Sequence, residues 1–386
     1  PIEGEFEADS KNEVINMLRE KNYLPVNIEA DSGAEAELNI FNPTVKKKEL
    51  AIFCRQFYTM IDAGIGIVRC LDILVMQTEN KTLKKGLQAV YEDVQKGFTI
   101  SSAMKKHEKI FPNILTNMVE AGEVSGNLDE IMARMADHFE KENRLENKIK
   151  SAMIYPIVLI VVSIAVVIFM LVNVLPTFVS MFEGSGVELP WPTEFVLAIS
   201  SSLQTYWYLF LAAIGLIVAI FSYFKTTQEG RRLLDGIKLK IPYFKIINIK
   251  IITSRFTRTL STLIGAGIPL IASMEVVSRV VNNAVVEERI IYGIENIRKG
   301  APLSRAVKDV EIFPPMVDSM INVGEESGAL DEILQKTADF YDEEVEESLQ
   351  RLTTLIEPLL IVIMALIIGF IVIAMALPMF DMVETI

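Results

Sequence analysis

The sequence predicts an all-α membrane protein with two homologous helical bundles, three transmembrane helices and a small α+β piece at its start. Three observations predict this fold class: three long apolar stretches, one block of sequence that occurs twice, and basic residues confined to two segments. The composition agrees, because 51% of the 386 residues are hydrophobic although 23% are charged. Such a mixture is typical of apolar spans that separate ordinary polar domains.

The first 45 residues are expected to form a partial α+β domain followed by a linker. Ser10 and Glu13 have the spacing of a capping box, in which each side chain accepts a hydrogen bond from a free backbone N–H of a helix start. A short helix should run to Lys21, and a strand should cover residues 23–28. The chain starts at Pro1 without an initiator Met, so this domain is expected to be incomplete.

Three stretches are long enough to cross a bilayer and contain no charged residue: 156–176, 205–224 and 358–378. A helix rises 1.5 Å per residue, so about 20 residues cover the roughly 30 Å hydrocarbon core. Buried helices of a soluble protein fit poorly, because few of them are apolar on every face over this length. The spans divide the chain into the N-terminal piece (1–45), a first bundle (46–155), a loop (177–204), a second bundle (225–357) and a tail (379–386).

The orientation follows from the basic residues. All 37 Lys and Arg side chains lie in residues 1–155 or 225–355, whereas the loop and the tail contain none. Because basic residues favour the cytoplasmic side, both bundles and the N-terminus are predicted to be cytoplasmic, and the loop and the C-terminus external. Two glycines and two prolines between residues 184 and 192 predict an irregular loop. The net charge of −13 argues against nucleic acid as a partner.

An internal repeat covers both bundles. Residues 111–142 and 313–344 share 14 identities in 32 positions at an offset of 202, and residues 53–74 match residues 256–277 at an offset of 203. Apolar residues recur at helical spacing in each copy, which predicts a helix with one buried face that continues into the membrane. The expected buried face consists of Leu128, Ile131, Met132, Met135 and Phe139 in the first copy, and of Leu330, Ile333, Leu334, Thr337 and Tyr341 in the second.

The most distinctive motif is Gly-Glu-x-Ser-Gly-x-Leu-Asp-Glu, which begins at residues 122 and 324. Glycine permits a tight turn, Ser125 or Asn127 is expected to cap the following helix, and the acidic pair favours the positive end of that helix. The motif is therefore either a structural joint or a docking surface for a partner, and a metal site near Glu123 is a further alternative. The candidate docking residues are Gly122, Glu123, Ser125, Gly126, Gly324, Glu325, Ser327 and Gly328.

The other motifs favour structural roles over catalysis. A second joint, around Gly64 and Gly267, lacks the Gly-Lys-Ser/Thr of a phosphate-binding loop. His107 and His138 are the only histidines, and Phe340 takes the place of His138 in the second copy. The two cysteines, at positions 54 and 70, are expected to be reduced core residues. The acidic run 342–347 predicts a solvated helix face or an electrostatic contact with a basic partner.

The chain resembles the inner-membrane platform proteins of type IV pilus and type II secretion systems, the PilC/GspF family. The resemblance covers residues 46–386 and rests on the two Gly-Glu-x-Ser-Gly-x-Leu motifs with their Phe-Pro leaders at residues 111 and 313. It implies a protein of the bacterial inner membrane with no enzymatic activity and no cofactor. A hexameric assembly ATPase would dock on it, and the ATPase cycle would be coupled to the insertion of pilins or pseudopilins.

The resemblance also implies contacts with other inner-membrane components of the machine and with further copies of the chain. The alternative function is that of a transporter or channel subunit. Transporters usually place charged side chains in their membrane spans, and these spans contain none.

Overall fold

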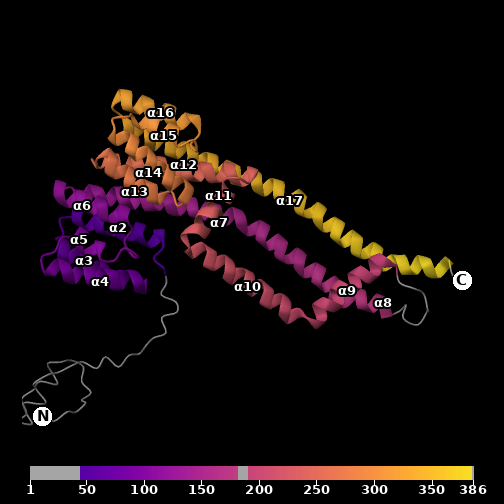
Figure 1. The fold of residues 1–386 in the computed structure, drawn as a ribbon. Coiled ribbons are helices and arrows are strands. Elements are labelled where there is room, and N and C mark those ends of the chain that lie inside the picture. Colours follow the sequence, from indigo (N-terminus) through magenta and orange to yellow (C-terminus); the bar gives the residue numbers. More distant parts are fainter. Residues whose placement is uncertain (1–43, 181–189, 385–386) are drawn as a thin grey trace, which may run out of the picture. The chain divides into compact units, whose positions relative to one another are not determined.

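A computed structural model describes residues 44–180 and 190–384, and every regular element in these ranges is a helix (Figure 1). The predicted all-α architecture is confirmed for this part of the chain. The α+β piece expected over residues 1–45, with its capping box and its strand, lies almost wholly outside the described residues.

The first bundle packs five short helices against the start of a long one. All five residues of the buried face predicted for the long helix are buried, which confirms that prediction. Cys54 and Cys70 are free thiols in the same core, as expected. The helices are α2 (Lys47–Asp62), α3 (Ile67–Gln77), α4 (Lys81–Gln95), α5 (Ile100–Lys105), α6 (Asn113–Ser125) and the long α7 (Leu128–Phe169).

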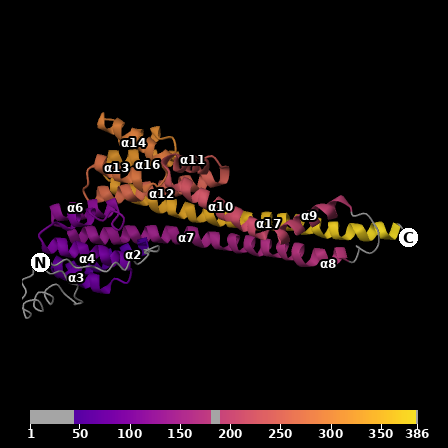
Figure 2. The same ribbon diagram turned by 60° about the horizontal axis from the view of Figure 1, so that its bottom comes forward.

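Helices α12 to α17 of the second bundle repeat this order, and a further helix, α11, precedes them (Figures 1 and 2). Gly64 and Gly267 adopt φ values of +81° and +79° at the same joint in each copy, where other residues would be strained. Three of the five residues of the predicted face are buried, and Leu330 packs partly exposed against the same core. The helices are α11 (Gln228–Lys238), α12 (Pro242–Gly265), α13 (Leu270–Val280), α14 (Ala284–Arg298), α15 (Leu303–Asp309), α16 (Pro315–Ser327) and the long α17 (Leu330–Glu384).

Three helices are long and apolar enough to cross a membrane. They include the first and third predicted spans in full and residues 207–224 of the second, because the second helix begins at Trp207. The long helix α7 continues through Pro156 and passes into a π-helix, η1 (Met170–Val174), and then into α8 (Leu175–Ser180). The second span is α10 (Trp207–Thr226), none of whose residues is buried against the described chain. The third span belongs to α17, which also includes residues 379–384 of the expected tail.

The expectation of an irregular loop over 177–204 is wrong at its start, where residues 177–180 belong to α8, and for its second half. Residues 191–205 form a helix, α9 (Trp191–Thr205), which begins directly after Pro190 and has Pro192 in its first turn. Proline is well tolerated in the first turn of a helix, because the N–H groups there have no helical partner. The same prolines that suggested a loop therefore mark a helix start.

Side chains of α9 donate hydrogen bonds to backbone carbonyls of η1 and α17. Ser200 Oγ lies 2.5 Å from the carbonyl oxygen of Leu171, and Gln204 Nε2 lies 3.3 Å from that of Val172. The Thr193 hydroxyl donates to the carbonyl of Ala374. A π-helix disturbs the regular backbone ladder, and in an apolar environment its carbonyl groups need other donors. The π-helix and α9 therefore stabilise each other.

Ser200→Ala removes the donor that contacts the Leu171 carbonyl and is expected to destabilise this region by about 1 kcal/mol, the order found for hydrogen bonds between membrane helices. The measurement is the Tm of the purified protein in detergent. The matched control is Ser201→Ala, because Ser201 is exposed and bonds only within α9. Equal Tm values for the two variants would contradict the prediction.

Candidate functional site

The two glycines of each Gly-Glu-x-Ser-Gly motif have different structural roles. Gly126 and Gly328 adopt φ values of +78° and +68°, the left-handed conformation that commonly ends a helix. A Cβ atom on Gly122 would lie 3.1 Å from Leu128 Cα, and one on Gly324 would lie 3.0 Å from the equivalent atom of α17. The first glycine therefore lets the short helix approach the long one closely, and the second turns the chain between them.

The motif glutamates bind the start of a short helix in their own bundle. In the first copy, Glu123 accepts hydrogen bonds from the N–H of Ile100 at 2.5 Å, from the N–H of Ser101 at 3.2 Å and from the Ser101 hydroxyl. In the second copy, Glu325 accepts from the N–H of Leu303 at 2.6 Å, and from the N–H and hydroxyl of the following serine at 3.1 and 2.7 Å. A carboxylate is favourable at this position because the first N–H groups of a helix lack partners and carry partial positive charge.

Sequence reasoning missed this contact, although a signal for it was present. Ser101 and Ser304 occupy equivalent positions at the same offset of 203 as the first block of the repeat. Both glutamates are half-buried, and their carboxylates are engaged within the bundle. The motif therefore contains a structural joint in both copies.

The predicted caps of the long helix are not formed. Asn127 makes no capping hydrogen bond to the described residues, and the exposed Ser125 makes none either. In the second copy, Ser327 donates instead to the carbonyl of Val323 in its own helix at 2.7 Å. The glycine turn leaves these side chains facing outward. The outward surface of the motif thus consists of residues 124–127 and 326–328.

The described residues contain no group of three His, Cys, Asp or Glu side chains arranged to hold a metal ion. This includes the surroundings of Glu123, where a metal was an alternative. Glu123 meets backbone and hydroxyl donors there, which bind a carboxylate without a cation.

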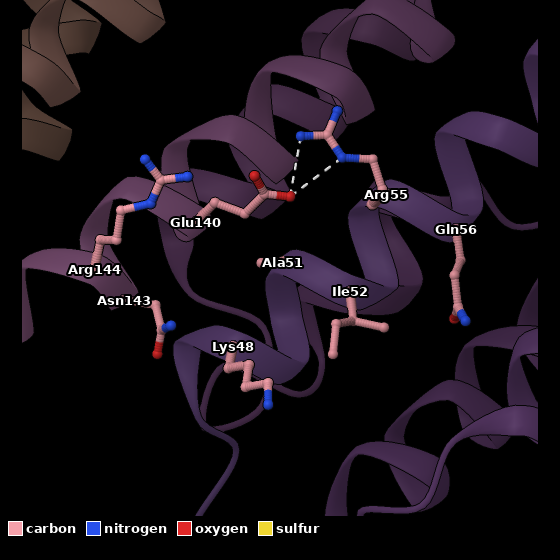
Figure 3. A pocket seen from close by; sticks show the side chains of 8 residues that line it. All are labelled: Lys48, Ala51, Ile52, Arg55, Gln56, Glu140, Asn143 and Arg144. Atoms are coloured by element: carbon pink, nitrogen blue, oxygen red, sulfur yellow. Dashed lines mark hydrogen bonds and ion pairs between the residues drawn. The ribbon is translucent and has the colours of Figure 1, made fainter. Parts of the chain in front are cut away.

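A repeated set of ion pairs fastens α2 to α7 in the first bundle and α12 to α17 in the second. In the first copy, Arg55 pairs with Asp137 at 2.5 Å and with Glu140 at 3.0 Å (Figure 3 shows the second pair). In the second copy, Arg258 pairs with the equivalent residues Asp339, at 3.3 Å, and Asp342. A further equivalent set joins Lys47 to Glu142, and Lys250 to Glu344 at 2.5 Å.

The two copies of these ion pairs differ in burial. The side chain of Arg55 is 39% exposed, whereas that of Arg258 is 2% exposed. The difference arises because α7 of the first bundle covers the second bundle. There Arg255 of α12 lies 3.7 Å from Glu142, and Lys141 lies 2.9 Å from Asp339.

Burial at this contact shifts two pKa values. His138 lies on the covered side of α7, and its burial lowers its pKa to about 4, so the imidazole is neutral at neutral pH. Burial by itself would raise the pKa of Glu142, but Lys47 and Arg255 together hold that pKa at about 2. The carboxylate of Glu142 is thus a charged and paired part of the contact between the bundles.

Two hollows lie beside these ion pairs. One, of about 380 Å³, lies between α7 and the second bundle, and its lining includes His138 and Arg258. The other, of about 370 Å³, is an open groove between α2 and α7 in the first bundle (Figure 3). We call the second one the α2/α7 groove. It is lined by Lys48, Ala51, Ile52, Arg55, Gln56, Glu140, Asn143 and Arg144.

Comparison with known proteins gives one consistent family. A family model described as type II secretion system (T2SS), protein F, matches residues 53–176 and 256–378, one match for each copy of the repeat. The type IV pilus assembly protein PilC of Thermus thermophilus is 39% identical over 391 residues, covering 100% of this chain and 95% of the relative.

Relatives from both kinds of machine match along nearly their whole length. The type IV pilus assembly protein PilC of Myxococcus xanthus is 38% identical over 380 residues, which is 98% of this chain and 91% of that protein. The type II secretion system protein F of Aeromonas hydrophila is 34% identical over 382 residues, which is 97% of this chain and 98% of that protein. These relatives are named for assembly and secretion systems, and none is named for a catalysed reaction.

Glu325→Ala should destabilise the second bundle by about 2 kcal/mol, because it removes a charged partner of three donors at the start of α15. The measurements are the Tm and the amide hydrogen exchange of α15. Glu326→Ala is the matched control, since Glu326 is exposed and bonds only to Asn322 one turn away. If Glu325→Ala left both measurements unchanged, the carboxylate would have no structural role.

Replacing the two equivalent arginines should have unequal effects. Arg258→Met leaves Asp342 without its cation beside a buried site, whereas Asp339 keeps Lys141, and the substitution is expected to cost about 3 kcal/mol. Arg55→Met removes an exposed pair and is expected to cost less than about 1 kcal/mol. Thermal unfolding of both variants in detergent measures the difference. Equal losses would show that α7 does not bury Arg258 in the folded protein.

Proposed function

The chain belongs to the type II secretion system protein F family, and we propose that it is a non-enzymatic membrane platform of a type IV pilus or type II secretion machine. Its role would be to dock a hexameric ATPase and to couple the ATPase cycle to insertion of pilin or pseudopilin subunits. The names of its relatives place the family in these two systems. The three apolar helices make the chain a multi-pass membrane protein.

The observation that carries this proposal is the continuity of the long helices. The 55 residues of α17 form one helix from the second bundle into the apolar region, about 80 Å at 1.5 Å per residue. The 42 residues of α7 do the same from the first bundle. A helix that does not end at the membrane surface transmits a movement of the bundle to the segment within the bilayer. This is the mechanical property that a coupling platform needs.

The motif joints lie at the starts of these two helices. In each copy 28 residues separate the first residue of the long helix from the proline that opens its span, about 42 Å. Both joints would therefore lie equally far from the bilayer. We propose that the ATPase contacts the outward surface of the joints, residues 124–127 and 326–328. In this proposal Gly122, Glu123, Gly324 and Glu325 hold that surface in place, and Ser125, Gly126, Ser327 and Gly328 form part of it.

The orientation and the partners complete the proposal. The basic residues favour a cytoplasmic location for both bundles, where an ATPase can reach them, and an external C-terminus. The apolar surface of α10, which has no buried residue, suits contact with lipid or with the membrane helices of pilins. Other inner-membrane components and further copies of the chain are the remaining proposed partners.

The joint surface can be tested with Val124→Arg combined with Glu326→Arg, in a strain whose own copy of the gene is deleted. Val124 is 85% exposed, so the substitutions should leave the fold intact. The expected result is about a tenfold loss of ATPase co-purified from membranes, equivalent to about 1.4 kcal/mol of binding. Loss of surface pili or of secreted proteins should accompany it.

The matched control is Met76→Arg combined with Tyr292→Arg. These side chains are 64% and 66% exposed and lie away from the joints, one in each bundle. ATPase recovery should be unchanged in the control. Normal piliation and normal secretion in the deletion strain itself would refute the proposed function, whereas normal ATPase recovery with the joint variant would refute only the docking surface.

A further inference from the structure

The second bundle has a face that is occupied by the first. In that face, Arg255 lies 3.7 Å from Glu142 and 3.9 Å from Glu146 of α7. Lys148 of α7 pairs with Glu346 of α17. The face formed by α12 and α17 thus serves as a receiving groove for α7. Leu145 completes this contact by packing in one apolar cluster with Val345, Leu349 and Ile251.

The equivalent groove of the first bundle is open. An offset of 203 maps α12 onto α2, and an offset of 202 maps α17 onto α7, so the receiving groove corresponds to the α2/α7 groove of Figure 3. Ile52, in the place of Arg255, is 47% exposed, and Lys48 and Arg144 are exposed as well. In Figure 3 these side chains surround the hollow, and Arg55 of α2 pairs with Glu140 of α7 at its edge. No described segment of the chain fills it.

The face of α7 that fills the receiving groove has an equivalent on α17, and this equivalent face packs against no described bundle. On α7 this face includes His138, Lys141, Leu145 and Lys148. The same offset maps it onto α17, where the corresponding side chains are all exposed. We call them the α17 acidic face: Phe340, Glu343, Glu347 and Gln350.

The open groove and the α17 acidic face have complementary charges. Lys48 and Arg144 have no carboxylate within 4.0 Å among the described residues, so their charges are available to a partner. Leu145, Val345 and Ile251 belong to one apolar cluster inside the chain, and the equivalent contact would place Glu347 near Asn143 and Lys48. The three apolar side chains are thus replaced by an acid, an amide and a base, so that both members of the contact have become polar and their charges are opposite. Glu347 now pairs with Arg351 at 2.9 Å, but this pair is exposed and contributes little.

The membrane restricts which helix can enter the groove. Within the chain α7 and α17 run parallel at the same height, because Lys141 meets Asp339 and Tyr155 meets Glu357, pairs that are 198 and 202 residues apart. A second copy in the same bilayer has the same orientation and the same depth. Its α17 is therefore already parallel to α7, with residues 340–350 level with the groove.

We propose that the α2/α7 groove receives the α17 acidic face of a second copy of the chain. The contact repeats between chains the contact that α7 makes with the second bundle within one chain. This proposal rests on the self-association included in the proposed function, and it identifies the two surfaces that would contact each other. Because its central contacts are charged, the contact weakens as the salt concentration rises.

The test is disulfide cross-linking in native membranes with Lys48→Cys and Glu347→Cys on separately tagged chains. Both chains carry Cys54→Ala and Cys70→Ala, which remove the two native thiols. The expected result after mild oxidation is a linked dimer that contains both tags, and its loss when either new cysteine is absent. In a further control, Met76→Cys takes the place of Lys48→Cys. Met76 is exposed on another helix of the same bundle, so this variant should not form the dimer.

A matched control reports on the internal contact. Leu145→Cys with Ile251→Cys in one chain should give an intrachain disulfide and no dimer, since both residues belong to one packed cluster. If that disulfide did not form, the proposal would be overturned, because the contact of α7 with the second bundle on which it is based would be absent. An amine-reactive cross-linker that captures dimers, without any disulfide between positions 48 and 347, would overturn this contact and leave self-association standing. Monomers in every experiment would overturn self-association as well.

Discussion

A helix that ends inside a bilayer leaves its last carbonyl groups with no hydrogen-bond donor. A chain that enters the membrane must therefore either cross it as one helix or receive donors from a neighbouring segment. Both solutions occur in this protein. The long helix α17 crosses without interruption, whereas α7 changes to a π-helix near the far end of its span and receives hydrogen bonds from α9 at that point. The requirement for satisfied backbone groups thus accounts for the length of the two long helices and for the position of α9.

The bundles in turn are organised around the long helices. Ion pairs such as Arg55–Asp137 and Arg258–Asp339 fix the positions of α2 along α7 and of α12 along α17. The motif glycine allows the preceding short helix to pack close to the start of the long one, and the motif glutamate orders another short helix beside it. A force applied at the joint therefore acts on a helix that is held laterally by its own bundle and continues into the membrane.

Much of this architecture could be predicted from the sequence, because periodicity and length are local properties. The spans, the repeat and the buried face of α7 depend only on hydrophobic patterns within single helices. The internal partners of Glu123 could not be predicted in this way, since Ile100 lies 23 residues earlier and reaches the carboxylate only after the bundle has packed. The helix α9 was missed because its prolines are compatible with both a loop and a helix start, and only its contact with η1 distinguishes them.

The comparison of the two copies separates residues that maintain the fold from residues that make contacts outside it. A residue that the fold requires must occur in both copies, as the motif glycines and glutamates do. A residue that contacts a neighbour is free to differ when the neighbours differ: His138 is buried against the second bundle, whereas its equivalent Phe340 is 40% exposed. The same holds for Leu145, which packs in a buried cluster, and for its exposed equivalent Glu347. Positions at which the two copies differ therefore indicate surfaces that contact neighbours. The shared motif instead indicates the structural joint that both bundles require.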